Sequence, residues 1–235
     1  MKQANTTVST VVLVHAAWAD ASSWNKVAVE LRRKGFLVRA AQIPLTSLAD
    51  DVAALNRLLQ KVDGPVLLAG HSYAGAVITA AATGNPNVKA LIYVAAIVPD
   101  EGETVGALFH DAEPNGGIRP HIAPDADGFL WLPEEAVTNA VAPDALLEER
   151  LLMYVTQHPI ALKCLAEQMT APAWKQKPSW FLIAEKDRMI APAKQRSMAE
   201  RIRAHICSYG VDHTPLLSAP DTVVRVISEA ADGVI

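Results

Sequence analysis

Short apolar runs alternate with helical patterns along the first hundred residues. Each run is apolar almost throughout, which is typical of strands that helices cover on both faces. Between the runs, apolar residues recur at the spacing of a helix. This alternation predicts a parallel sheet with crossover helices. The four runs span residues 10–15, 36–41, 66–70 and 91–96.

Boundary signals support two of the crossover helices. The pattern over residues 22–34 ends at Gly35, and Ser47 with Asp50 forms a capping-box pattern that opens a helix running toward Gly64. Both segments are therefore expected to cover the sheet.

The pattern resumes near the end of the chain. Two further apolar runs, 180–184 and 206–209, predict strands, and residues 222–231 predict a closing helix. The expected core is an α/β fold with about six mostly parallel strands in a doubly wound sheet.

The stretch between about residues 99 and 178 interrupts this rhythm. It holds many of the prolines, a Gly116–Gly117 pair and helical patterns such as residues 143–156. We expect a small helical lid, inserted after the fourth strand.

Length and composition fit one domain. The chain has 235 residues, of which 51% are hydrophobic and 20% are charged. Residues 1–235 are expected to form a single domain, with a core of 1–98 and 179–235 and a lid of about 99–178. No apolar run approaches the roughly 20 residues of a membrane span. The polar start of the chain shows no secretory signal, so the cytoplasm is the expected compartment.

The net charge and the two cysteines bear on which partners and cofactors are expected. The net charge is -4 and Lys and Arg are scattered, so no basic face predicts nucleic-acid binding. Cys164 and Cys207 lack a second ligand at the spacing of a structural zinc site, and we expect reduced core residues and neither a metal nor another cofactor. The sequence does not set the oligomeric state, and a homodimer stays open.

A candidate nucleophile lies where an apolar strand meets a helix. Residues 66–75 (VLLAGHSYAG) run from the strand into a turn with Ser72 at its apex. Such a nucleophile elbow is strained and brings helix and strand close together, which requires small neighbours. Gly70, Ala74 and Gly75 meet this requirement, although glycine is commoner where Ala74 stands. The alternative is a serine that caps an ordinary helix.

Backbone N–H groups near this turn are candidates for an oxyanion hole. The N-terminus of a helix favours negative charge, so the Tyr73 N–H is one expected donor. The second should come from the loop after the first strand, where the Ala17 N–H is preferred and the Ala16 N–H is the alternative. His15, in the same loop, is expected to hold the backbone by hydrogen bonds.

Position selects the base and the acid. Of seven histidines, His213 lies after the last predicted strand, at the carboxyl edge of the sheet. Asp187 follows the preceding strand and is the preferred acid. Glu185 competes because the strand end is uncertain by two residues, whereas Asp212 is too close in sequence to orient His213. In these roles His213 would deprotonate Ser72, which would attack a carbonyl carbon.

Five segments in order carry a family resemblance: VLVHAAWADASSW (12–24), GHSYAG (70–75), YVAA followed by PDEGE (93–103), EKDR (185–188) and DHTP (212–215). They resemble α/β-hydrolases of the plant methylesterase and hydroxynitrile lyase type, with their bacterial esterase relatives. The resemblance covers nearly the whole chain. It implies the α/β-hydrolase fold, a Ser, His, Asp triad, a small helical cap and esters with hydrophobic acyl or aromatic parts as substrates.

A carboxylesterase acting on small to medium hydrophobic esters is therefore the expected function. Trp18 follows the oxyanion loop and is the preferred pocket residue, with Ala16, Trp131 and Met153 as further expected substrate contacts. Most large apolar residues of the lid are expected to pack the lid onto the core.

Two alternative functions stay open. One is a ligand receptor that kept the fold but turns over little substrate, and the other is a lyase or a cofactor-free oxygenase on the same scaffold. Cyanohydrin cleavage is disfavoured, because the resembling lyases have a lysine where Thr214 stands. They also use a threonine in the first loop, where this chain has Ala16 and Ala17.

Overall fold

Six parallel strands form the central sheet of the computed structural model, which describes residues 9–110 and 122–234. The sheet confirms the expected α/β architecture. Its spatial order reverses between β1 and β3, so the loops that follow these two strands meet at the edge where ligands bind in such sheets. In spatial order the strands are β2 (Leu37–Ala41), β1 (Thr10–Val14), β3 (Val66–His71), β4 (Val88–Val94), β7 (Ser179–Ala184) and β8 (His205–Tyr209).

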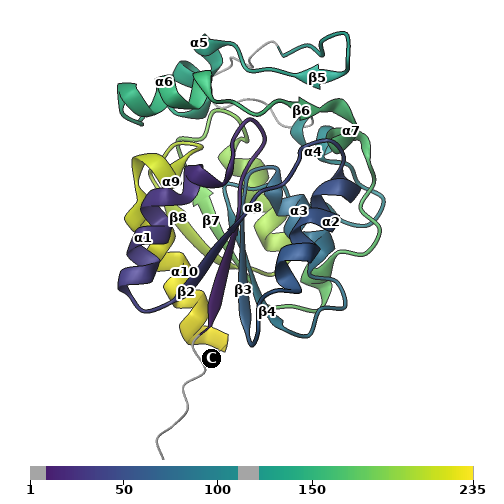
Figure 1. The fold of residues 1–235 in the computed structure, drawn as a ribbon, viewed down its shortest axis with the longest axis vertical. Coiled ribbons are helices and arrows are strands. Elements are labelled where there is room, and N and C mark those ends of the chain that lie inside the picture. The colour runs from purple at the N-terminus through teal and green to yellow at the C-terminus, as the bar shows by residue number, and fades with distance from the viewer. Residues whose placement is uncertain (1–8, 111–121, 235) are drawn as a thin grey trace, which may run out of the picture.

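Helices cover both faces of the sheet (Figure 1). Alternate residues of β1 serve the two faces: Val11 and Leu13 join the core on one side, and Val12 and Val14 join the core on the other. One face is covered by α1 (Asn25–Arg33) and α10 (Pro220–Val234), and the other by α2 (Leu48–Leu59), α3 (Ala74–Ala81) and α8 (Pro192–Arg201).

The two outer strands differ from the inner ones. Although their sequences are largely apolar, most residues of β2 and β8 are exposed or half-buried, because each strand has a neighbour on one side only. The expectation of burial on both faces therefore holds for the four inner strands.

Helix boundaries follow the capping signals in part. The Ser47 side chain accepts from the Asp50 N–H and starts α2, which ends at Leu59, before the expected Gly64. The first crossover begins as a 3-10 turn, Ala21–Trp24, capped by Asp20, before α1 continues. Within the described part of the chain, no helix combines the length and apolar character needed to cross a membrane.

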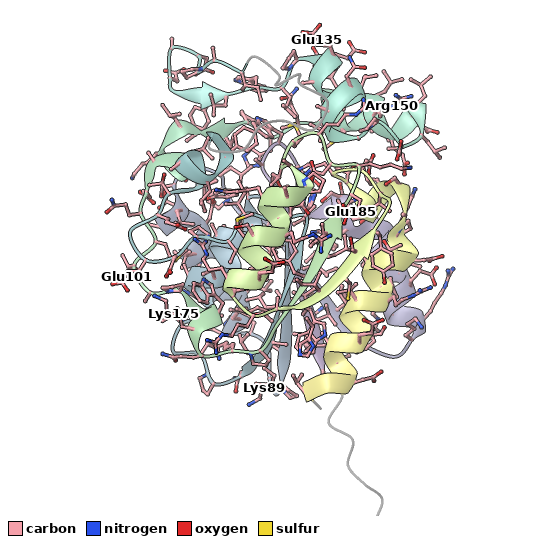
Figure 2. All side chains as sticks on the ribbon, turned by 180° about the vertical axis from the view of Figure 1, so that it is seen from behind. Lys89, Glu101, Glu135, Arg150, Lys175 and Glu185 are labelled. Carbon is pink, nitrogen blue, oxygen red and sulfur yellow. The ribbon has the colours of Figure 1, made fainter. Side chains whose placement is uncertain are left out.

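Part of the segment between β4 and β7, here called the insert, lies over the end of the core at which the strands finish (Figure 1). Another part, which holds Glu101 and Lys175, lies beside the core (Figure 2). The insert contains a two-stranded antiparallel sheet that its sequence did not predict, and the Gly116–Gly117 pair lies outside the described residues. Its elements are α4 (Val105–His110), β5 (Phe129–Leu130), α5 (Glu134–Ala136), a π-helical turn (Val137–Val141), α6 (Leu147–Val155), β6 (Ile160–Ala161), α7 (Leu162–Ala166) and a 3-10 turn (Ala173–Lys175).

Candidate active site

Ser72 occupies a strained turn between β3 and α3. Its φ of 54° lies in the left-handed region that non-glycine residues seldom adopt. The neighbours must be small: a Cβ on Gly75 would lie 2.4 Å from the Ile97 carbonyl oxygen, and one on Gly70 would lie 2.7 Å from that of Ala74. Crowding of this kind is what a nucleophile elbow requires, and it accounts for both glycines.

Ser72, His213 and Asp187 form a continuous hydrogen-bonded chain. The Oγ of Ser72 lies 3.0 Å from Nε2 of His213, and Nδ1 of His213 lies 2.7 Å from Oδ2 of Asp187. All three side chains are buried, and Asp187 completely so. They follow three different strands, β3, β8 and β7, at the carboxyl edge of the sheet. With the proton on Nδ1, His213 donates to the carboxylate and its Nε2 can accept the serine proton.

Asp187 is held by more than the histidine. Its Oδ1 accepts from the backbone N–H groups of Met189 and Ile190, at 2.7 and 2.9 Å. Its Oδ2 accepts from Nε2 of Gln195 at 2.7 Å. These three donors fix the orientation of the buried carboxyl group beside the base.

Gln195 was not predicted from the sequence to be a site residue. It is completely buried on α8, where its Oε1 also accepts from the Ala184 N–H at 3.0 Å. A glutamine in a polar helix carries no signal of such a role, because only the fold brings it under the loop that holds Asp187.

The two competing carboxylates have other partners. Glu185, labelled in Figure 2, lies at the surface and pairs with Arg196. Asp212 accepts from the Thr214 N–H and the Ser218 hydroxyl, and from the backbone N–H of Asp144 in the insert. Of the three candidates, Asp187 is the one that contacts the His213 ring.

Two neutral histidines brace the loops around the site. His71 donates from Nε2 to the backbone oxygen of His213 at 2.7 Å, and burial lowers its pKa to about 3. His15 contacts the Ala16 oxygen through Nδ1 and accepts from the Ile43 N–H, and burial lowers its pKa to about 4. These contacts agree with the expected loop-holding role of His15. His121, another of the seven histidines of the chain, lies outside the residues that the structure describes.

The candidate oxyanion donors are unpaired. Among the residues that the structure describes, the N–H groups of Tyr73, Ala17 and Ala16 have no hydrogen-bond acceptor. Trp18, which directly follows Ala16 and Ala17, has a φ of 58° and turns the chain there. The choice between Ala17 and Ala16 as the second donor stays open, since both N–H groups are available.

A cavity of about 250 Å³ lies between the first loop and the insert. Trp18 and Met153, two of the predicted substrate contacts, line it, whereas Ser72 and His213 do not. Its apolar wall also includes Leu152 of α6. The cavity therefore lies beside the loop that holds the candidate oxyanion donors, and no triad residue lines it.

The other two predicted substrate contacts are placed differently. Ala16 is buried in the first loop. The structure does not bring Trp131 to the cavity: its ring is half exposed, and its indole N–H donates to Asp125 Oδ2 at 2.9 Å. This bond holds Trp131 at the surface of the insert.

The profile of the alpha/beta hydrolase family matches residues 11–226, which is nearly the whole chain. The chain belongs to this family. As an α/β-hydrolase it is 25% identical to a pyrethroid hydrolase of Sphingobium wenxiniae over 254 aligned positions, covering 96% of this chain and 89% of that protein. It is 24% identical to methylesterase 3 of Arabidopsis thaliana over 251 positions, covering 94% and 95%.

Solved structures show the same fold for this α/β-hydrolase. A polyneuridine aldehyde esterase superposes with a TM-score of 0.83 at 18% identity, over 96% of this chain and 100% of that one. A pyrethroid hydrolase superposes with a TM-score of 0.81 at 21% identity, over 96% and 98%. The expected resemblance to α/β-hydrolases of the methylesterase group is therefore confirmed.

Proposed function

We propose that this α/β-hydrolase is a serine carboxylesterase that cleaves small to medium hydrophobic esters through an acyl-enzyme. The observation that carries the proposal is the hydrogen-bonded chain from Ser72 through His213 to Asp187. A serine needs an adjacent base to become a nucleophile at neutral pH, and the base needs a third group to fix its tautomer.

The reaction follows from these contacts. His213 Nε2 takes the proton from Ser72 as Oγ attacks the ester carbonyl carbon, and Asp187 stabilises the imidazolium. The N–H groups of Tyr73 and of Ala17 or Ala16 hold the oxyanion. The tetrahedral intermediate then expels the alcohol, which takes the proton from His213. Water, deprotonated by His213, attacks the acyl-enzyme in the same way and releases the acid and the free serine.

Two observations support a hydrophobic ester as substrate. The cavity beside the first loop has an apolar wall that includes Trp18, Leu152 and Met153, and such walls bind apolar groups. Several relatives also bear the names of esterases or hydrolases, among them a pyrethroid hydrolase and a methylesterase.

Turnover of a p-nitrophenyl ester series of increasing acyl length tests the proposal, with a fluorophosphonate probe as titrant of the serine. Ser72→Ala and His213→Ala should each lower kcat by about 10⁴-fold or more, and Ser72→Ala should also abolish labelling. Ser197→Ala on the exposed side of α8 and His205→Ala at the exposed start of β8 are the matched controls and should keep wild-type rates.

Other outcomes overturn the proposal. A wild-type protein that neither hydrolyses the series nor reacts with the probe, yet binds an apolar ligand stoichiometrically, would be a receptor. Activity that survives Ser72→Ala but not His213→Ala would indicate a lyase or a cofactor-free oxygenase.

A further inference from the structure

A buried carboxylate that the proposed reaction does not use lies under the nucleophile elbow. Asp51 of α2 is completely buried, and its Oδ2 accepts from the Tyr73 hydroxyl at 2.6 Å. Its Oδ1 accepts from the Leu45 N–H at 2.7 Å, and the Cys164 thiol of α7 lies 3.7 Å from Oδ2. One carboxylate thus joins α2, the elbow and the insert.

The protonation states fit this arrangement. Burial raises the pKa of the Tyr73 phenol far above neutrality, and that of the Cys164 thiol to about 12, so both keep the proton that they donate. Burial also raises the pKa of Asp51 to about 6, so the charged form is destabilised but still predominates at pH 7. An apolar side chain would pack there without this penalty, which favours a specific role for the carboxylate.

Tyr73 links this carboxylate to the chemistry. Its side chain is anchored on Asp51, and its backbone N–H, unpaired among the described residues, is the candidate oxyanion donor directly after Ser72. We propose that Asp51 and Tyr73 form a positioning pair, in which the phenol–carboxylate bond fixes the backbone of Tyr73 and so aims its N–H at the oxyanion. This inference rests on the proposed esterase function.

Tyr73→Phe tests the pair, because it removes one oxygen and keeps the ring. We expect kcat to fall about tenfold with KM unchanged, a part of the 10²- to 10³-fold loss that follows deletion of an oxyanion donor. Affinity for a trifluoromethyl ketone, whose serine adduct carries an oxyanion, should fall by the same factor. Asp51→Asn keeps the volume and can still pair with the phenol, so it should retain more activity than Tyr73→Phe.

Tyr93→Phe is the matched control. Tyr93 is also completely buried, and its hydroxyl pairs with Thr79 at 2.9 Å, so the change removes a similar bond from the core. It should lower stability but leave kcat within twofold. If Tyr73→Phe and Tyr93→Phe had the same kcat, the positioning role would be overturned, and the esterase function would still stand on the Ser72-dependent turnover of the wild type. If the wild type showed no Ser72-dependent turnover, both the positioning role and the esterase function would be overturned.

Discussion

The Nε2 of His71 lies 2.7 Å from the backbone oxygen of His213, so the residue before the nucleophile braces the loop that carries the base. The two rings also contact each other, with centroids 5.1 Å apart. Because burial lowers the pKa of His71 to about 3, its ring is neutral at pH 7 and Nε2 donates its proton to this bond. The relative position of nucleophile and base thus depends on a histidine outside the triad.

Two substitutions of His71 should distinguish the loss of its hydrogen bond to His213 from a change in side-chain packing. His71→Leu removes the donor and leaves the His213 carbonyl unpaired, and we expect kcat to fall about tenfold and stability to fall by about 1 to 2 kcal/mol. The amide of His71→Gln can still donate, so this variant should retain most of the rate. Ester turnover and urea denaturation measure both effects. Equal rates in the two variants would contradict the bracing role.

Gln195 should likewise support turnover, through its hydrogen bond to Asp187. Gln195→Leu leaves the Ala184 N–H without its acceptor and removes one donor from Asp187, so we expect stability to fall by about 2 kcal/mol and kcat to fall about tenfold. Gln195→Glu places a second carboxylate beside Asp187 and should be the more damaging change to kcat at pH 7. A Gln195→Glu variant as active as the wild type would show that the contact is dispensable.

The elbow should reject any added side-chain carbon at Gly75. In Gly75→Ala the new Cβ meets the Ile97 oxygen at 2.4 Å, and the resulting backbone shift should lower stability by about 3 kcal/mol and nearly abolish turnover. Gly210→Ala is the control, because its Cβ would have no atom nearer than Lys186 Cε at 4.0 Å. It should change stability by less than about 0.5 kcal/mol. Similar melting temperatures for both variants would contradict the crowding.

Stability should fall as the pH drops from 6.5 toward 4. His15 and His71 have lowered pKa values, about 4 and about 3, so near pH 5 the unfolded chain binds protons that the folded chain excludes. Asp51 has the opposite effect on stability. Because its pKa is raised to about 6 in the folded chain, the folded chain binds a proton near pH 5 that the unfolded chain does not. Asp51 therefore opposes the two histidines and makes the loss of stability smaller than the two would cause together.

Urea denaturation at several pH values checks this balance. His71→Gln should make the slope of stability against pH smaller by about 1.3 kcal/mol per pH unit near pH 5, the effect of one proton. A slope that is unchanged in His71→Gln would mean that the ring is already charged in the folded protein.

The periodic part of the chain predicted the sheet, because strand runs and capping signals are local. Ser47 starts α2 as its pattern indicated, and the order of the runs gave six strands. The positions of Ser72, His213 and Asp187 could be inferred because strand ends converge at one edge of a parallel sheet.

Other features depend on contacts between distant segments, which no local pattern encodes. Gln195 is 8 residues from Asp187 but reaches it only because α8 packs under the loop. Asp51 meets Tyr73 across two elements 22 residues apart. The surface position of Trp131 has the same cause, since its partner Asp125 lies in the insert, where the pattern is weakest.

The left-handed backbone of Ser72 has an evolutionary consequence. A glycine would adopt a φ of 54° without strain, so selection for stability alone would favour glycine over serine at this position. Lineages that lost the need for catalysis would thus be expected to lose this side chain early. Laboratory selection of thermostable variants should accordingly screen for turnover in every round, since the most stable descendants need not keep their nucleophile.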